Sequence, residues 1–149
     1  MDLNDAHTAL DSVRDTDRRM AERMRWPFQR HALFGLGEGL VVMGIGIAGT
    51  TGIAAAGAGF ALLISLFYQD KQRTGMFVSG MKGRRTRPLL VTILAVLIAA
   101  ITAVVFLRWD EGTNPLVLLV SAALAAFLTW ASIRWEKLYR AELLSGEAR

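Results

Sequence analysis

Three long stretches without a charged residue limit the folds that this chain can adopt. They cover residues 39–69, 88–107 and 112–133, which are 31, 20 and 22 residues long. A helix needs roughly 20 apolar residues to cross a hydrocarbon core of about 30 Å. Hydrophobic residues make up 53% of the 149 residues and charged residues only 20%, which is more apolar side chain than a soluble domain of this size can bury. The sequence therefore predicts an integral membrane protein.

The first uncharged stretch also contains a glycine pattern that competes with this interpretation. Gly44, Gly46 and Gly49 form a G-x-G-x-x-G motif after an apolar run, and Asp70 follows 26 residues after Gly44. This spacing is near that of a dinucleotide-binding turn. The helix of such a unit needs one polar face, yet residues 50–68 carry no charge. The rest of the chain offers no further βαβ units, so we do not expect a nucleotide site.

The first uncharged stretch is too long for one membrane-spanning helix. A helix over residues 33–68 would be about 54 Å long, well beyond the thickness of a bilayer core. We therefore expect two helices, at about 27–48 and 51–69. A tight turn at residues 49–52 would join them, because its glycines permit the left-handed conformations that end helices and its threonines can cap the next helix.

The other two uncharged stretches predict one helix each. Pro88 suits the first turn of a helix over about 88–107, and Asn114 is a suitable N-cap for a helix over about 115–134 that opens with Pro115. The predicted fold class is all-α, an integral membrane four-helix bundle with an amphipathic cytoplasmic helix at its N-terminus.

Positive charge predicts how these helices are oriented. Of the 17 Lys and Arg residues, six lie in residues 1–30, six lie in residues 70–87, four follow residue 133, and Arg108 is the remaining one. Basic segments stay in the cytoplasm, so both termini and the loop 70–87 are expected there. The excess of Arg over Lys, with abundant Ala and Gly, is typical of a high-GC bacterial genome. We therefore expect the bacterial inner membrane.

The N-terminal segment 1–26 has an apolar stripe at helical spacing. Its members are Leu3, Ala6, Leu10, Val13, Met20 and Met24. Five Arg nearly balance six acidic residues there, so the helix should pack against protein rather than anionic lipid. One candidate contact is the same helix of a second copy, or another membrane or cytoplasmic protein. The other is a helical tail at 135–149, through Leu138, Leu143 and Leu144. Topology accounts for the net positive charge, and no nucleic-acid partner is expected.

Small residues recur at four-residue spacing in every expected span, which favours close helix packing in lipid. The stripes are Gly35 and Gly39; Gly52 and Ala56, Ala54 and Ala58, Ala55 and Gly59; Ala95, Ala99 and Ala103; and Ser121, Ala125 and Thr129. They predict tight packing within one bundle, or a homodimer interface along one stripe.

Glu38 is the only ionisable residue well inside the apolar blocks. It would lie roughly 15–18 Å from the turn near Gly49. A carboxyl at that depth is costly, so it is a candidate functional residue and is expected to be protonated and to donate a hydrogen bond. The hydroxyls on the same half of the membrane are its possible partners: Ser65, Thr92, Thr129 and Ser132. A structural role, tying helices together, remains an equal alternative.

No catalytic, cofactor or metal site is predicted. The chain has no cysteine, which excludes thiolate chemistry. His7 and His31 have no companions at metal-ligand spacing, and no nucleophile and base can be paired from the sequence. We therefore expect no cofactor and no enzyme.

Two function classes remain. The first is a membrane-anchored interaction or regulatory protein whose cytoplasmic helices form the working surface. The second is a small proton-coupled transporter subunit that uses Glu38. Four short helices with an acid in the first resemble the small multidrug resistance transporters in layout, without a shared motif. Those proteins lack a long N-terminal cytoplasmic helix.

The segment ALDSVRDTDRRMAERMRWPFQRHALFG, residues 9–35, is an Arg-rich helix that ends in Trp-Pro before the first span. It resembles the opening of small uncharacterised four-span membrane proteins of high-GC bacteria. The resemblance covers about 27 residues and the four-span layout. It implies a topology and carries no activity.

Overall fold

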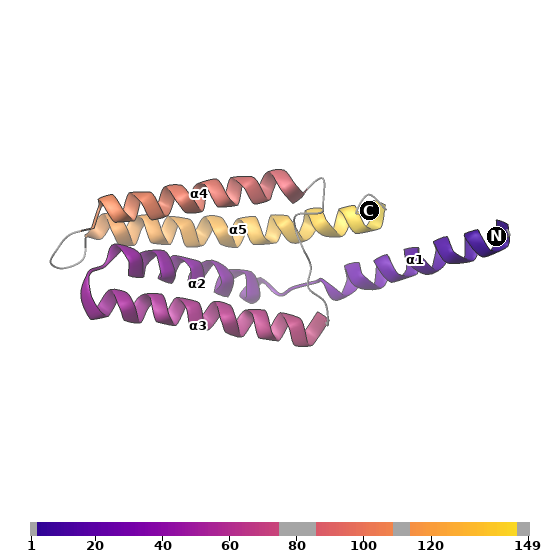
Figure 1. Ribbon diagram of the computed structural model, residues 1–149, viewed down its shortest axis with the longest axis horizontal. Coiled ribbons are helices and arrows are strands. Elements are labelled where there is room, and N and C mark those ends of the chain that lie inside the picture. The colour runs from indigo at the N-terminus through magenta and orange to yellow at the C-terminus, as the bar shows by residue number, and fades with distance from the viewer. Residues whose placement is uncertain (1–2, 75–85, 109–113, 146–149) are drawn as a thin grey trace.

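The structure, a computed structural model, describes residues 3–74, 86–108 and 114–145, and these residues fold almost entirely into helices, with no strand among them. The helices are α1 (Leu3–Arg23), α2 (Phe28–Gly46), α3 (Gly49–Thr74), α4 (Thr86–Phe106) and α5 (Pro115–Ser145). Helices α2 to α5 lie side by side, and α1 leads away from one end of them (Figure 1). The prediction of an all-α chain is confirmed. Most of the basic loop expected at residues 70–87 lies outside the described residues.

The turn between α2 and α3 is shorter than expected. Ile47 is extended, and its N–H donates to the carbonyl oxygen of Met43 at 3.1 Å, which ends α2 two residues before the predicted limit. Gly49 has a φ of +77° and begins α3, because a residue without a Cβ adopts this conformation at little cost. Gly52, expected in the turn, is inside α3, as are both threonines. A Cβ on Gly52 would lie 2.7 Å from the Gly44 carbonyl oxygen.

Asn114 joins α4 to α5, and its predicted role as an N-cap is confirmed. Its Oδ1 accepts a hydrogen bond from the N–H of Leu116 at 3.0 Å, and its Nδ2 donates to the carbonyl oxygen of Leu107 at 2.8 Å. Pro115 is the first residue of α5, as expected. Pro88 is the third residue of α4 rather than the first. The separate tail expected after residue 134 is a direct continuation of α5 as far as Ser145.

Three helices are long and apolar enough to cross a membrane: Gly49–Arg73, Thr86–Phe106 and Pro115–Ser145. Helix α2, the fourth predicted span, is not among them. The physical reason lies in its composition, because α2 carries Arg30, His31 and Glu38 and is rich in weakly hydrophobic glycine.

Glycines on two faces of α2 let it pack closely between α3 and α5. Towards α3, a Cβ on Gly44 would lie 2.5 Å from both the Ala56 nitrogen and the Gly52 carbonyl oxygen. Towards α5, a Cβ on Gly39 would lie 2.9 Å from the Ala125 Cβ and 3.0 Å from the Ser121 carbonyl oxygen. The predicted stripe at Gly35 and Gly39 therefore meets the one at Ser121 and Ala125, whereas the stripe at Gly52 and Ala56 meets Gly44. By contrast, four members of the other stripes are exposed: Ala54, Ala58, Ala95 and Ala99.

Contacts between the described helices centre on α2. It packs on α3, α4 and α5, and α4 also packs on α5. Helix α3 packs extensively only on α2, so α3 and α4 lie on opposite edges (Figure 1). The core between α2, α4 and α5 is built from Val42, Ile47, Ala100, Val104, Val117, Leu124 and Leu128. Helices α3 and α4 do not pack extensively on each other.

Candidate functional site

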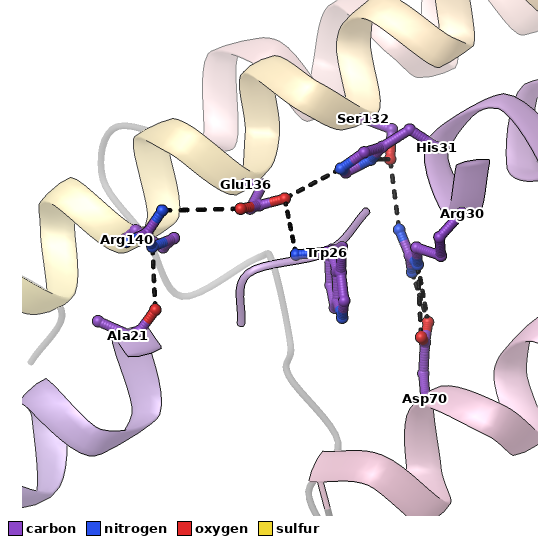
Figure 2. A network of polar contacts seen from close by, with 8 residues as sticks. All are labelled: Ala21, Trp26, Arg30, His31, Asp70, Ser132, Glu136 and Arg140. Carbon is purple, nitrogen blue, oxygen red and sulfur yellow. Dashed lines mark hydrogen bonds and ion pairs between the residues drawn. The ribbon is translucent and has the colours of Figure 1, made fainter. Parts of the chain in front are cut away.

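The most highly connected polar region lies where α1, α2, α3 and α5 meet, at the end of the helix group from which α1 leaves (Figures 1 and 2). We call it the polar cluster; its members are Arg30, His31, Asp70, Ser132, Glu136 and Arg140. It joins residues about 100 positions apart in sequence. Sequence reasoning treated His31 as having no companion and did not anticipate the cluster.

Consecutive residues at the start of α2 form its centre. Arg30 donates from Nε to Asp70 Oδ2 at 3.2 Å and from Nη2 to the same oxygen at 2.5 Å, which ties α2 to α3. Its Nη1 lies 3.4 Å from Ser132 Oγ on α5. The guanidinium carbon also lies 3.7 Å from the centre of the Trp26 ring, where a cation is attracted by the ring face. One arginine thus contacts α3, α5 and the segment that precedes α2.

His31 is 2% exposed and links the same serine to Glu136. Its Nδ1 lies 2.9 Å from Ser132 Oγ, and its Nε2 lies 2.9 Å from Glu136 Oε2. An ionised carboxylate only accepts hydrogen bonds, so Nε2 carries the proton and Nδ1 accepts from the serine hydroxyl. The Ser132 oxygen then accepts from Arg30 while its proton points to His31. The Ser132 hydroxyl therefore links Arg30 to His31.

Glu136 and Arg140 lie one turn apart on α5, and both contact the segment in which α1 ends and α2 begins. Glu136 Oε2 accepts a hydrogen bond from the backbone N–H of Trp26 at 3.4 Å. Arg140 Nε donates to the carbonyl oxygen of Ala21 at 2.9 Å, and its Nη1 lies 3.8 Å from Glu136 Oε1. Ala21 is in the last turn of α1, where carbonyl groups lack helical partners and a cation is favoured. The two side chains therefore cap α1 and position the start of α2 (Figure 2).

A small apolar cluster beside these groups completes the docking of α1. Ala21, Met24 and Leu143 are buried together, with Met20, Trp26, Trp135 and Tyr139 packed against them. Trp26 stacks on Trp135 with centroids 6.1 Å apart, and Trp135 stacks on Tyr139 at 5.1 Å. Of the two contacts expected for the N-terminal helix, the structure shows the one with the C-terminal tail. Leu143 makes it, whereas Leu144 is 59% exposed.

Ser132, His31 and Glu136 have the order of a nucleophile, a base and an acid, but their setting does not favour catalysis. Ser132 lies in the interior of α5, where backbone N–H groups are used by the helix and are not available to stabilise an oxyanion. The cluster contains two guanidinium groups and two carboxylates, so their formal charges balance. Within the described residues, no group of three or more His, Asp or Glu side chains could hold a metal ion. The polar cluster therefore suits a structural role, in which its side chains connect α2, α3 and α5.

Glu38, the candidate from the sequence, lies apart from the polar cluster. Its side chain is partly buried and makes no hydrogen bond or ion pair with any residue that the structure describes. At helical spacing it shares a face of α2 with Phe34, Val42 and Ile45, which pack into the apolar core. Glu38 therefore lies among apolar side chains on this part of α2.

The four hydroxyls expected near Glu38 have other partners. Thr92 donates to the Pro88 carbonyl oxygen at 3.0 Å and Thr129 to that of Ala125 at 2.8 Å. Ser65 accepts from Gln69 at 3.4 Å, and Ser132 belongs to the polar cluster. The signal in sequence for that cluster was the four-residue spacing of Ser132, Glu136 and Arg140, which places them on one face of α5.

No family model matches this chain, and neither a curated protein nor a solved structure matches it.

Proposed function

We propose that the protein is a small multi-pass inner-membrane protein that presents α1 as a membrane-anchored interaction surface and has no catalytic role of its own. In this proposal α2 crosses the bilayer together with α3, α4 and α5. Its 19 residues give a length of about 28 Å, close to the thickness of a hydrocarbon core. Its packing between α3 and α5 supports the same assignment, because its neighbours are both candidate spans.

The observation that carries the proposal is the way α1 is attached. Helix α5 is one continuous helix of 31 residues, longer than a single span needs. Its last turns pack on the C-terminal end of α1, and the rest of α1 extends away from the other helices (Figure 1). The polar face of α1 is exposed at Asp15, Arg18 and Glu22. A helix that projects from the membrane is suited to binding another protein.

The orientation can be tested with single cysteines, since the chain has none. Thr51→Cys, in the exposed first turn of α3, is expected to react with a membrane-impermeant maleimide added outside intact cells. Asp15→Cys in α1 is expected to react only after the cells are opened, because 16 of the 17 basic residues belong to the segments expected in the cytoplasm, where α1 is also expected. Labelling of Thr51→Cys only from the cytoplasm would rule out the α2–α3 hairpin as a pair of spans.

Site-specific photocrosslinking tests the interaction surface itself. A benzophenone amino acid at Asp15 or Arg18 is expected to give a discrete protein adduct in native membranes. The same group at Phe60, which is 55% exposed on the apolar part of α3, is the control and should give lipid adducts. If neither α1 position yields a protein adduct of its own, the proposed role of α1 is wrong.

A second candidate function, proton-coupled transport, is favoured by one observation. Glu38 is a carboxyl on an apolar helix face and has no partner among the described residues. Intramembrane acids of this kind often exchange protons during transport. Helix packing alone gives no reason to keep such a group, because a carboxyl within the hydrocarbon region is costly.

Transport predicts a large effect of Glu38→Gln, which keeps the size of the side chain and removes its charge. In proteoliposomes with an imposed pH gradient, efflux of a cationic dye should fall at least about tenfold, and Glu22→Gln in exposed α1 should leave it unchanged. Equal dye movement by the wild type and Glu38→Gln, or none by either, would reject the transporter.

A further inference from the structure

The polar cluster has two branches that share Ser132. In one branch, Ser132 Oγ lies 3.4 Å from Arg30 Nη1, and Arg30 holds Asp70 at the end of α3. In the other branch, Ser132 Oγ lies 2.9 Å from His31 Nδ1. His31 Nε2 contacts Glu136, and Glu136 accepts a hydrogen bond from the backbone N–H of Trp26. One hydroxyl therefore connects the group that fixes α3 with the groups that fix α1 (Figure 2).

A second contact joins the two branches independently of the serine. The Arg30 guanidinium lies over the Trp26 ring, 3.7 Å from its centre, and Trp26 stacks on Trp135 within the apolar cluster that docks α1. A planar guanidinium can pair with a carboxylate and stack on an aromatic ring at the same time, and a lysine cannot reproduce both contacts. Arg30 can keep all of its contacts only while Asp70 and Trp26 both stay in place.

Each of the two helices that the cluster holds packs extensively on only one neighbour. Among the described helices, α3 packs extensively only on α2, and α1 packs extensively only on α5. The Arg30–Asp70 pair is the cross-link at the end of α3, with side chains 19% and 24% exposed. The hydrogen bond from Arg140 Nε to the Ala21 carbonyl oxygen connects the end of α1 to α5 in the same way.

We propose that the polar cluster couples the position of the α3 end to the docking of α1. When α1 leaves α5, Trp26 moves away from Arg30 and Glu136 loses its backbone donor, so Arg30 and Asp70 are held less firmly. When Asp70 is displaced, Arg30 shifts and weakens the docking of α1 through Trp26 and Ser132. This coupling is reciprocal because it is a free energy shared by two sites. It goes beyond the proposed function and does not depend on what α1 binds.

The coupling can be measured with spin labels on the full chain in lipid nanodiscs. One label pair, Asp15→Cys with Arg134→Cys, reports the distance between α1 and α5. The other, Gln72→Cys with Arg134→Cys, reports the distance between α3 and α5; all three positions are exposed. Asp70→Asn is expected to raise the fraction of undocked α1 at least about fivefold. Arg140→Gln is expected to raise the fraction of displaced α3 by a similar factor.

The controls change exposed charges next to the cluster. Lys71→Gln on α3 and Lys137→Gln on α5 should leave both distance distributions unchanged. Ser132→Ala is a smaller perturbation that keeps both ion pairs, and it should widen both distributions at once. If Asp70→Asn moves only α3, if Arg140→Gln moves only α1, or if Ser132→Ala widens at most one distribution, the two ends are independent and the coupling is disproved.

Discussion

Replacing Gly44 by alanine is expected to destabilise the protein by about 1–3 kcal/mol, the range for overpacking a close contact. The new Cβ would lie 2.5 Å from the Ala56 nitrogen and 2.5 Å from the Gly52 carbonyl oxygen. Both atoms belong to the backbone of α3, so no side-chain rotation can relieve the contact. The two helices must move apart, which weakens the packing along the whole of α3.

Gly57→Ala is the matched control, because the same methyl group is added to the same helix pair. A Cβ at Gly57 would have no other atom within 4 Å, so the unfolding free energy should change little or rise slightly, as alanine has the higher helix propensity. The measurement is unfolding of the full chain by increasing mole fraction of SDS in mixed micelles, followed by tryptophan fluorescence. Equal unfolding midpoints for the two variants would show that α2 and α3 are not in close contact at Gly44.

Glu136→Ala is expected to have the second large effect, about 1–3 kcal/mol, because it leaves buried hydrogen-bond donors without their acceptor. The Glu136 side chain is 10% exposed and that of His31 is 3% exposed. Without the carboxylate, His31 Nε2 and the backbone N–H of Trp26 both lose their acceptor, and an unsatisfied buried donor is costly. Arg140 also loses its ion-pair partner. The docking of α1 should fail before the rest of the protein unfolds.

Limited trypsin digestion can detect this local change. Arg25 is exposed in the segment between α1 and α2, and cleavage after it should be faster in Glu136→Ala than in the wild type. Lys137→Ala alters the neighbouring exposed position on α5 and should leave the cleavage rate as it is. A rate for Glu136→Ala equal to that control would mean that the polar cluster does not hold α1.

Local sequence signals predicted the elements of the fold well. Asn114 and Pro115 marked the start of α5 because capping depends on residues adjacent in the chain. The helix ends near Gly46 and Gly49 were displaced by two residues, since the extended conformation of Ile47 depends on how α3 packs back on α2. The stripes at Gly39 and Ala125 were recognised, but their pairing was not, because spacing along a helix does not show which neighbour a face meets.

The candidate site was predicted less well, for a related reason. Glu38 was found because a charge inside an apolar block is visible in the sequence, and the structure gives it none of the four expected hydroxyl partners. His31 was set aside because its companions, Ser132 and Glu136, lie 101 and 105 positions later. Such contacts form only when α2 and α5 lie side by side, and no local pattern reports them.

The sequence by itself determined that this chain is helical, that most of it is too apolar for a soluble domain, and where its helices begin to within a few residues. These properties follow from hydrophobic runs, proline, glycine and capping residues, which act over a few positions. Only the tertiary structure decided that α2 lies between α3 and α5, that the glycines of both its faces are used, and that Arg30, His31 and Glu136 meet where α1 docks. Those contacts depend on which helix faces pack together, and that choice is made by the complementary shapes of distant parts of the chain.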